Sequence, residues 1–356
     1  MSELRVGLIG GTGLGEALGV EHSGTRHEVD TPFGRPSDAI LEAEWAGVPV
    51  LILSRHGRGH VLSPSQVPYR ANLFALKQLG CTHILASGAV GSLREEYKPR
   101  QLVIPDQIID RTSRRPATFY ERAAVHVEFA EPFCPVLRQL LLEAGSRVSG
   151  VGNRVSGEEQ ARENPSPSDP NPETRDPISD PHPRGCYVAM EGPAFSTRAE
   201  SLMHRLWGGD LIGMTAMPEA KLAREAEIPY ALVALVTDYD CWRHKPPLPD
   251  AAEQQEKVDP HLLLKEIMGN LRAATDAAVA LVRRTVELMA QRRELLQACP
   301  ASRALELAIW SDKASIAPDE VARLAPLWGK YFASEPPPAP ALPPAPAAGE
   351  VDRGGD

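Results

Sequence analysis

The stretch DLIGMTAMPEAKLAREAEIPYALVALVTDYD, residues 210–240, indicates the fold class of this chain. It begins with a short apolar strand, continues as a helix and ends in a longer, almost entirely apolar strand. Polar side chains follow each strand at once, with Thr215 after the first and Asp238 and Asp240 after the second. A strand–helix–strand unit is typical of α/β proteins, in which ligands bind at the carboxyl ends of the strands.

The same alternation of strands and helices extends over most of the chain. Short apolar runs predict strands, and longer runs with apolar residues three or four apart predict helices. The alternation therefore predicts an α/β fold built on one largely parallel sheet. We expect strands at 4–10, 48–54, 81–90, 100–110 and 185–193, and helices at 69–80, 132–145, 199–208 and 258–298.

Composition and charge exclude several classes of protein. The 356 residues are 42% hydrophobic, enough for a sizeable core, and the net charge of −9 comes without any basic cluster. Neither a nucleic acid nor a membrane surface is therefore expected as a partner. The five cysteines are irregularly spaced and include no C-x-x-C pair, which predicts free thiols in the cytoplasm. We find no signal peptide and no apolar run long enough to span a membrane.

The uneven distribution of proline guides the prediction of domain organisation. Many of the 34 prolines fall in two stretches, ENPSPSDPNPETRDPISDPHP at 163–183 and the tail from residue 335. Neither stretch offers an apolar face, so both are predicted to be disordered, the first as an expanded surface loop, rather than partner-binding motifs. The predicted organisation is one domain at 1–290 with a disordered insertion at about 158–184, a helical extension at 291–334 and a disordered tail at 335–356.

The glycine-rich segment VGLIGGTGLGE, residues 6–16, follows the first predicted strand. It does not match the dinucleotide fingerprint G-x-G-x-x-G, because Glu16 or Leu18 stands where the third glycine belongs. No P-loop lysine follows either. A glycine turn with the Thr12 hydroxyl can hold one phosphate through its backbone amides, and it can equally be a plain tight turn.

Four further predicted strand ends carry polar or glycine residues, and we expect all five ends to meet in one site. They are Arg55 with His56, Ser87–Val90, Met214 with Thr215, and Asp238–Asp240.

Six sequence strings stand out along the chain: SRHGRGH (54–60), the run from VPYRANL to QIIDRT (67–112), EPFCP (131–135), MEGPAFSTRAES (190–201), GMTAMPEAKLAREA (213–226) and VTDYDCW (236–242). In this order they closely resemble the 5′-methylthioadenosine phosphorylases, a group in the trimeric branch of the purine nucleoside phosphorylase family. The resemblance covers about residues 4–290 apart from the insertion. It implies a phosphorylase/hydrolase-like three-layer α/β fold, with a central mixed β-sheet flanked by helices, and a homotrimer or a dimer of trimers.

The resemblance implies a reaction of purine and methionine salvage. Inorganic phosphate attacks C1′ of 5′-methylthioadenosine, and the products are adenine and 5-methylthioribose 1-phosphate. Phosphate is a co-substrate, and neither a metal nor an organic cofactor is expected. Arg55 and His56 offer N–H donors to it, although the family usually has Ser, Thr or Asn where Gly88 stands. The implied phosphate-binding residues are Thr12, Arg55, His56, Ser87, Gly88 and Thr215.

On the nucleoside side, the resemblance implies Asp238 and Asp240 as catalytic residues that assist the leaving purine, with Arg55 and His56 acting on the phosphate. Asp238 must be protonated to donate to N7, so burial would have to raise its pKa. Asp240, two residues along a strand, would face the same side. The family's 6-oxopurine enzymes carry Asn in place of Asp238, so the aspartate favours adenine.

The remaining implied nucleoside contacts surround the base, the ribose and the 5′ end. Phe195 would stack on the base, Ser196 would bond near the base edge, and Met214 would pack on the ribose beside Ala89. His126 would be lent by a neighbouring subunit to the apolar 5′ pocket, with Val258 as another pocket residue. His261 stands near an expected aliphatic position, which leaves a 5′-hydroxyl substrate open.

Three other interpretations remain. The same fold can act on another purine nucleoside: 5′-methylthioinosine, inosine or adenosine. An NAD-dependent oxidoreductase would use the glycine loop, but the broken glycine register argues against it. A binding or scaffolding protein without turnover is a third possibility, against which the four polar residues Arg55, His56, Thr215 and Asp238 argue together.

Overall fold

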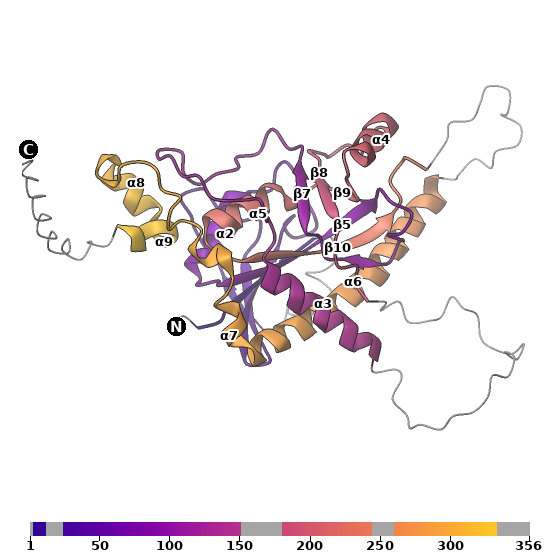
Figure 1. Ribbon diagram of the computed structural model, residues 1–356, viewed down its shortest axis with the longest axis horizontal. Coiled ribbons are helices and arrows are strands. Elements are labelled where there is room, and N and C mark those ends of the chain that lie inside the picture. The colour runs from indigo at the N-terminus through magenta and orange to yellow at the C-terminus, as the bar shows by residue number, and fades with distance from the viewer. Residues whose placement is uncertain (1–2, 12–23, 151–179, 244–259, 333–356) are drawn as a thin grey trace, which may run out of the picture.

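The computed structural model describes residues 3–11, 24–150, 180–243 and 260–332. The candidates Thr12 and Val258, the side chain of His261 and the predicted tail lie outside the described residues. Within them the chain forms a ten-stranded sheet flanked by helices (Figure 1). The strands are β1 (Val6–Gly10), β2 (Thr25–His27), β3 (Ile40–Trp45), β4 (Val48–Ser54), β5 (His83–Ser92), β6 (Leu102–Val103), β7 (Gln107–Asp110), β8 (Cys186–Ala189), β9 (Leu211–Gly213) and β10 (Tyr230–Asp238).

The helices follow the predicted segments closely. The helices are α2 (Tyr69–Gln78), α3 (Pro135–Gly150), α4 (Arg198–Leu206), α5 (Ala216–Glu225), α6 (Pro260–Gln291), α7 (Arg293–Leu296), α8 (Pro318–Arg323) and α9 (Ala325–Trp328). No helix within the described residues is long and apolar enough to cross a membrane.

The sheet is mixed, as the family resemblance implies. Strand β1 lies parallel to both β4 and β5, and β10 lies parallel to β5, so four carboxyl ends meet at one edge. Antiparallel pairing of β5 with β9, β3 with β4, and β10 with β6 makes the sheet less parallel than the alternation alone predicts. The pairing order is β2-β3-β4-β1-β5-β9-β8-β7, with β10 against β5 and β6.

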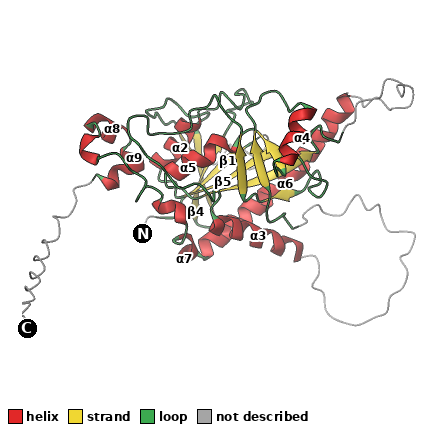
Figure 2. Cartoon of the chain, turned by 45° about the horizontal axis from the view of Figure 1, so that its top comes forward, coloured by secondary structure: helices red, strands yellow, loops and turns green. Residues whose placement is uncertain are grey.

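Helices cover both faces of the sheet and make the three predicted layers (Figure 2). Neighbouring residues of β1 point to opposite faces, as strand geometry requires: Ile9 packs with α2 and α5, and Leu8 packs with α3 and α6. Because both faces are covered, strand β10 is apolar and buried nearly throughout.

Two segments beyond the central layers are also ordered. Helices α8 and α9 lie at the opposite end of the molecule from α4 (Figure 1). Trp328 of α9 is fully buried, and the centroid of its ring lies 4.8 Å from that of Tyr120. Most of the predicted insertion lies outside the described residues, but 180–184 belong to the ordered chain. There the prediction of disorder is wrong, because His182 exchanges backbone hydrogen bonds with Leu102 and Ile104.

Candidate active site

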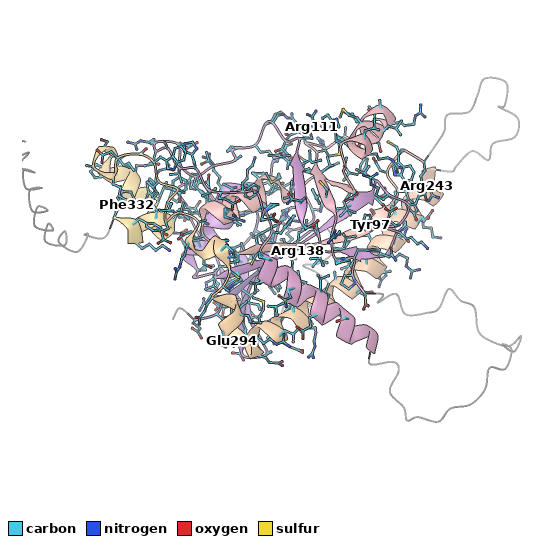
Figure 3. All side chains as sticks on the ribbon, in the orientation of Figure 1. Tyr97, Arg111, Arg138, Arg243, Glu294 and Phe332 are labelled. Carbon is cyan, nitrogen blue, oxygen red and sulfur yellow. The ribbon has the colours of Figure 1, made fainter. Side chains whose placement is uncertain are left out.

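A cavity of about 1000 Å³ opens at the edge of the sheet where the strand ends meet. Ten of the predicted site residues line it: Arg55, His56, Gly88, Ala89, Phe195, Ser196, Met214, Thr215, Asp238 and Asp240. Arg243, labelled in Figure 3, also lines the cavity, and its guanidinium lies over the ring of Tyr239. The sequence therefore locates part of the cavity wall, and residues from 61–66 and from α6 also contribute to it.

Arg55 supplies a fixed positive charge at one end of the cavity. Its guanidinium is buried and forms a two-pronged ion pair with Glu219, from Nε to Oε2 at 2.8 Å and from Nη2 to Oε1 at 2.9 Å. Its Nη1 donates to the carbonyl of Ser87 at 2.8 Å. Burial alone would lower the pKa of Arg55, but the Glu219 carboxylate raises it above the usual range, so the side chain stays charged.

Glu219 is a residue that the sequence does not reveal as part of the site. It is fully buried in the first turn of α5, and Oε1 also accepts a hydrogen bond from the Tyr230 hydroxyl at 2.8 Å. A buried carboxylate of this kind is stable only when it is paired and hydrogen-bonded. Glu219 and Tyr230 thus fix the orientation of Arg55 from behind the cavity wall.

His56 presents an acceptor rather than the expected donor. Its Nδ1 lies 2.8 Å from the carbonyl of Leu62, which can only accept, so Nδ1 carries the proton. Burial and the charge of Arg55 lower the pKa of His56 to about 4, and the ring is neutral at pH 7. Nε2 then carries a lone pair and can accept a hydrogen bond from a protonated phosphate oxygen. The ring stacks on His60 at 4.1 Å between centroids.

Gly88 and Thr215 lie side by side in the cavity wall. A Cβ at Gly88 would lie 3.4 Å from the Thr215 hydroxyl, so the glycine leaves open space there. Thr215 precedes α5, and its side chain makes no helix-capping hydrogen bond but is hydrogen-bonded to Tyr187. Ser87 is placed differently: its hydroxyl accepts from the Gly11 amide at 3.4 Å and does not line the cavity. Ser87 therefore bonds the amide of Gly11, the residue after β1.

Asp238 and Asp240 form a carboxyl pair at the other end of the cavity. Asp238 accepts hydrogen bonds from the Thr237 hydroxyl at 2.7 Å and from the Asp240 amide at 2.8 Å. The two carboxyls do not share a strand face, because β10 ends at Asp238 and Asp240 turns away with φ of 47°. The Asp238–Asp240 hydrogen bond across this turn is what brings both into the cavity wall.

Asp240 is anchored by a residue of α4 that the sequence did not suggest. The Ser201 hydroxyl is fully buried and donates to Asp240 Oδ2 at 2.5 Å. Burial raises the pKa of Asp240, and the negative charge of Asp238 raises it further, against the opposing effect of Ser201. Asp240 is therefore shifted toward its neutral form.

Replacing Ser201 with alanine is expected to lower kcat/KM about 10-fold, because an intramolecular hydrogen bond contributes about 0.5–1.5 kcal/mol. Steady-state kinetics on the variant measure this effect. Ser146→Ala removes a hydroxyl from the exposed face of α3 and should leave kcat/KM unchanged. Equal kinetics in the Ser201 variant and the wild type would contradict a role for Ser201 in holding Asp240.

The loop after β8 forms another part of the cavity wall. Phe195 leaves 85% of its surface exposed, so one ring face is open to a ligand. Gly192 has φ of 64°, and a Cβ there would lie 2.5 Å from the Met214 sulfur, so only glycine lets Met214 pack against this loop. The Ser196 hydroxyl lies 3.7 Å from the Met190 sulfur, and its carbonyl accepts from the Cys241 thiol at 3.3 Å.

His126 lies away from this cavity. Its side chain is exposed, its amide donates to the Ala308 carbonyl at 2.9 Å, and its ring lies 4.5 Å from that of Trp310. Within one chain the structure therefore does not bring His126 to the other candidates.

Among the described residues, no group of three His, Cys, Asp or Glu side chains is arranged to hold a metal ion.

The chain belongs to the phosphorylase superfamily, because the model of that family matches residues 5–287. An S-methyl-5′-thioadenosine phosphorylase of Synechocystis is 41% identical over 339 residues, which cover 94% of this chain and 89% of the relative. One from Xenopus tropicalis is 41% identical over 76% of this chain and 85% of its own length.

Solved structures agree with this family. A methylthioadenosine phosphorylase from an antarctic soil metagenomic library superposes with a TM-score of 0.73 at 37% identity, covering 92% of this chain and 99% of its own. The methylthioadenosine phosphorylase of Schistosoma mansoni in complex with adenine superposes with a TM-score of 0.69 at 33% identity, covering 86% of this chain and 99% of its own.

Proposed function

We propose that this protein is a pentosyltransferase that cleaves 5′-methylthioadenosine with inorganic phosphate, yielding adenine and 5-methylthioribose 1-phosphate. One observation carries the proposal: a single cavity has a buried, permanently charged arginine at one end and a carboxyl pair at the other. An anionic nucleophile and a purine leaving group need such opposite ends. Relatives named S-methyl-5′-thioadenosine phosphorylase are about 40% identical over most of the chain, and they support the same substrate.

Phosphate would lie between Arg55, Thr215 and the amide of Gly88, with His56 accepting from a P–OH group. Thr12, outside the described residues, is proposed to contribute its hydroxyl. Glycosidic cleavage passes through an oxocarbenium-like transition state, which the bound anion stabilises before it captures C1′. Phosphate is itself the nucleophile, so the proposed reaction uses neither a metal nor an organic cofactor.

At the other end, the departing purine accumulates negative charge and needs a proton at N7. The Asp238–Asp240 pair is proposed to supply it, because burial and the negative charge of Asp238 raise the pKa of Asp240. The carboxylate oxygens also accept from a 6-amino group, which favours adenine over a 6-oxopurine. Phe195 would stack on the base, and Ser196, Met214 and Ala89 would line the rest of the nucleoside site.

We further propose a cytoplasmic homotrimer, or a dimer of trimers, in which His126 of one subunit and Val258 complete the 5′ pocket. The surface around His126 supports a covered interface, since Leu307 and Trp310 leave 89% and 71% of their surfaces exposed in the single chain. Exposed apolar groups of this size favour a protein partner. Sedimentation of the purified chain tests the oligomeric state.

A panel of nucleosides, assayed with and without phosphate, tests the activity. We expect adenine release from 5′-methylthioadenosine only when phosphate is present, and little release of hypoxanthine from inosine or 5′-methylthioinosine. Adenosine tests the 5′ preference that His261 leaves open. Absence of adenine release from 5′-methylthioadenosine contradicts the proposal, and release without phosphate would indicate a hydrolase.

A further inference from the structure

Arg115 is a buried cation outside the cavity wall, in the loop that follows β7. Its Nη1 donates to the carbonyls of Met214 at 2.5 Å and Met217 at 2.7 Å. Its Nη2 donates to the carbonyls of Glu191 at 2.5 Å and Met190 at 3.4 Å. One guanidinium thus joins the segment after β9 to the segment after β8.

The guanidinium is itself held in place by a carboxylate. Nε of Arg115 donates to Glu191 Oε1 at 3.1 Å, and Glu191 Oε2 accepts from the amides of Ser113 and Arg114. Burial alone would raise the pKa of Glu191, but these hydrogen bonds and the Arg115 charge lower it, so the carboxylate stays ionised. A planar, fully charged guanidinium offers five N–H donors in a fixed arrangement to these acceptors and to the Tyr69 hydroxyl at 3.2 Å, whereas a lysine ammonium offers three.

The two joined segments carry the residues of the nucleoside end of the cavity. Met190, Phe195 and Ser196 belong to the first, and Met214 belongs to the second. Thr215, the phosphate candidate between Met214 and Met217, has a separate support, since its amide donates to the Tyr187 hydroxyl at 3.3 Å. Loss of Arg115 would therefore displace the nucleoside end more than the phosphate end.

From this arrangement we infer that Arg115 is a positioning residue that sets the geometry of the nucleoside site without touching the substrate. The inference rests on the proposed function for its kinetic consequence. A misplacement of about 1 Å by a substitution outside the chemistry can cost about 100-fold in rate.

Arg115→Lys tests the inference, with steady-state kinetics measured separately against 5′-methylthioadenosine and against phosphate. We expect the KM for the nucleoside to rise about 10- to 100-fold and the KM for phosphate to change less than about 3-fold. Arg138→Lys is the matched control: Arg138, labelled in Figure 3, also holds two carbonyls, but these belong to Pro105 and Pro183, which do not line the cavity, whereas Met190 and Met214 do. Equal rises in both KM values, or the same changes in the control, would overturn the inference.

Amide hydrogen exchange supplies a readout that needs no activity. We expect faster exchange in 190–197 and 213–217 in Arg115→Lys, and unchanged exchange there in Arg138→Lys. Glu191→Gln, which removes the charge opposite Nε, should give the same pattern more weakly if the first variant does not fold. Unchanged exchange in both variants refutes the inference, whereas a wild-type enzyme inactive on 5′-methylthioadenosine refutes only the proposed function.

Discussion

Asp238→Asn is expected to lower kcat/KM for 5′-methylthioadenosine by about 100-fold or more, because general acid–base assistance contributes about 10²–10⁴-fold. The amide carries no negative charge to raise the pKa of Asp240, and it offers donors where the adenine 6-amino group needs an acceptor. The protein should still fold. The Asn oxygen can accept from the Asp240 amide, and its NH₂ group can donate to the Thr237 hydroxyl.

The substrate dependence of this variant separates a chemical role from a structural one. A 6-oxopurine nucleoside presents an acceptor to the new amide, so its kcat/KM should fall less than that of 5′-methylthioadenosine. Asp110→Asn is the control, because Asp110 also ends a strand and pairs with Lys221 at 2.7 Å but does not line the cavity. Unchanged adenine release by the Asp238 variant would show that the leaving group departs without this carboxyl.

The part of the fold that positions the site is readable from the sequence. Strand β10 and strand β4 are continuous apolar runs that end in polar residues, and parallel pairing through β1 and β5 brings those ends together. Burial on both faces dictates the apolar run, and the polar residue marks where the strand leaves the core. For this reason Arg55 and Asp238 could be assigned to one cavity before any coordinates were known.

Other parts of the sheet carry weaker signals. Strands β2 and β3 are partly exposed and rich in polar residues, and the sequence patterns did not predict them. The segment 100–110 reads as one strand but forms two, because the chain turns between β6 and β7 at Pro105. Strand β6 pairs with β10, and β7 pairs with β8, so the two halves join different neighbours.

The residues that support the cavity wall could not be found from local patterns at all. Glu219 meets Arg55 from 164 positions away, Glu191 meets Arg115 from 76, and Ser201 meets Asp240 from 39. Each is an ordinary polar residue in its own segment. Only the packing of distant elements shows which polar groups are buried together and must therefore pair.

Glu219→Gln is expected to reduce the free energy of unfolding by about 3–5 kcal/mol, because it leaves the buried Arg55 charge without a counter-charge. Urea unfolding of the two proteins measures the difference. The same change should raise the KM for phosphate about 10-fold or more, since the guanidinium loses one of the charge-assisted hydrogen bonds that fix its plane. The KM for the nucleoside should change less.

Tyr230→Phe distinguishes the charge of Glu219 from its packing. It removes one hydrogen bond to Oε1 but leaves the Arg55–Glu219 ion pair intact, so a loss of only about 1 kcal/mol is expected. An equal loss of unfolding free energy in Glu219→Gln and Tyr230→Phe would mean that the Arg55–Glu219 ion pair contributes no more to stability than a neutral hydrogen bond. A phosphate KM that stayed constant in Glu219→Gln would mean that Arg55 needs no fixed orientation to hold the anion. Because the anion must approach a guanidinium already bonded to Glu219 and Ser87, that orientation decides which N–H groups remain to meet it.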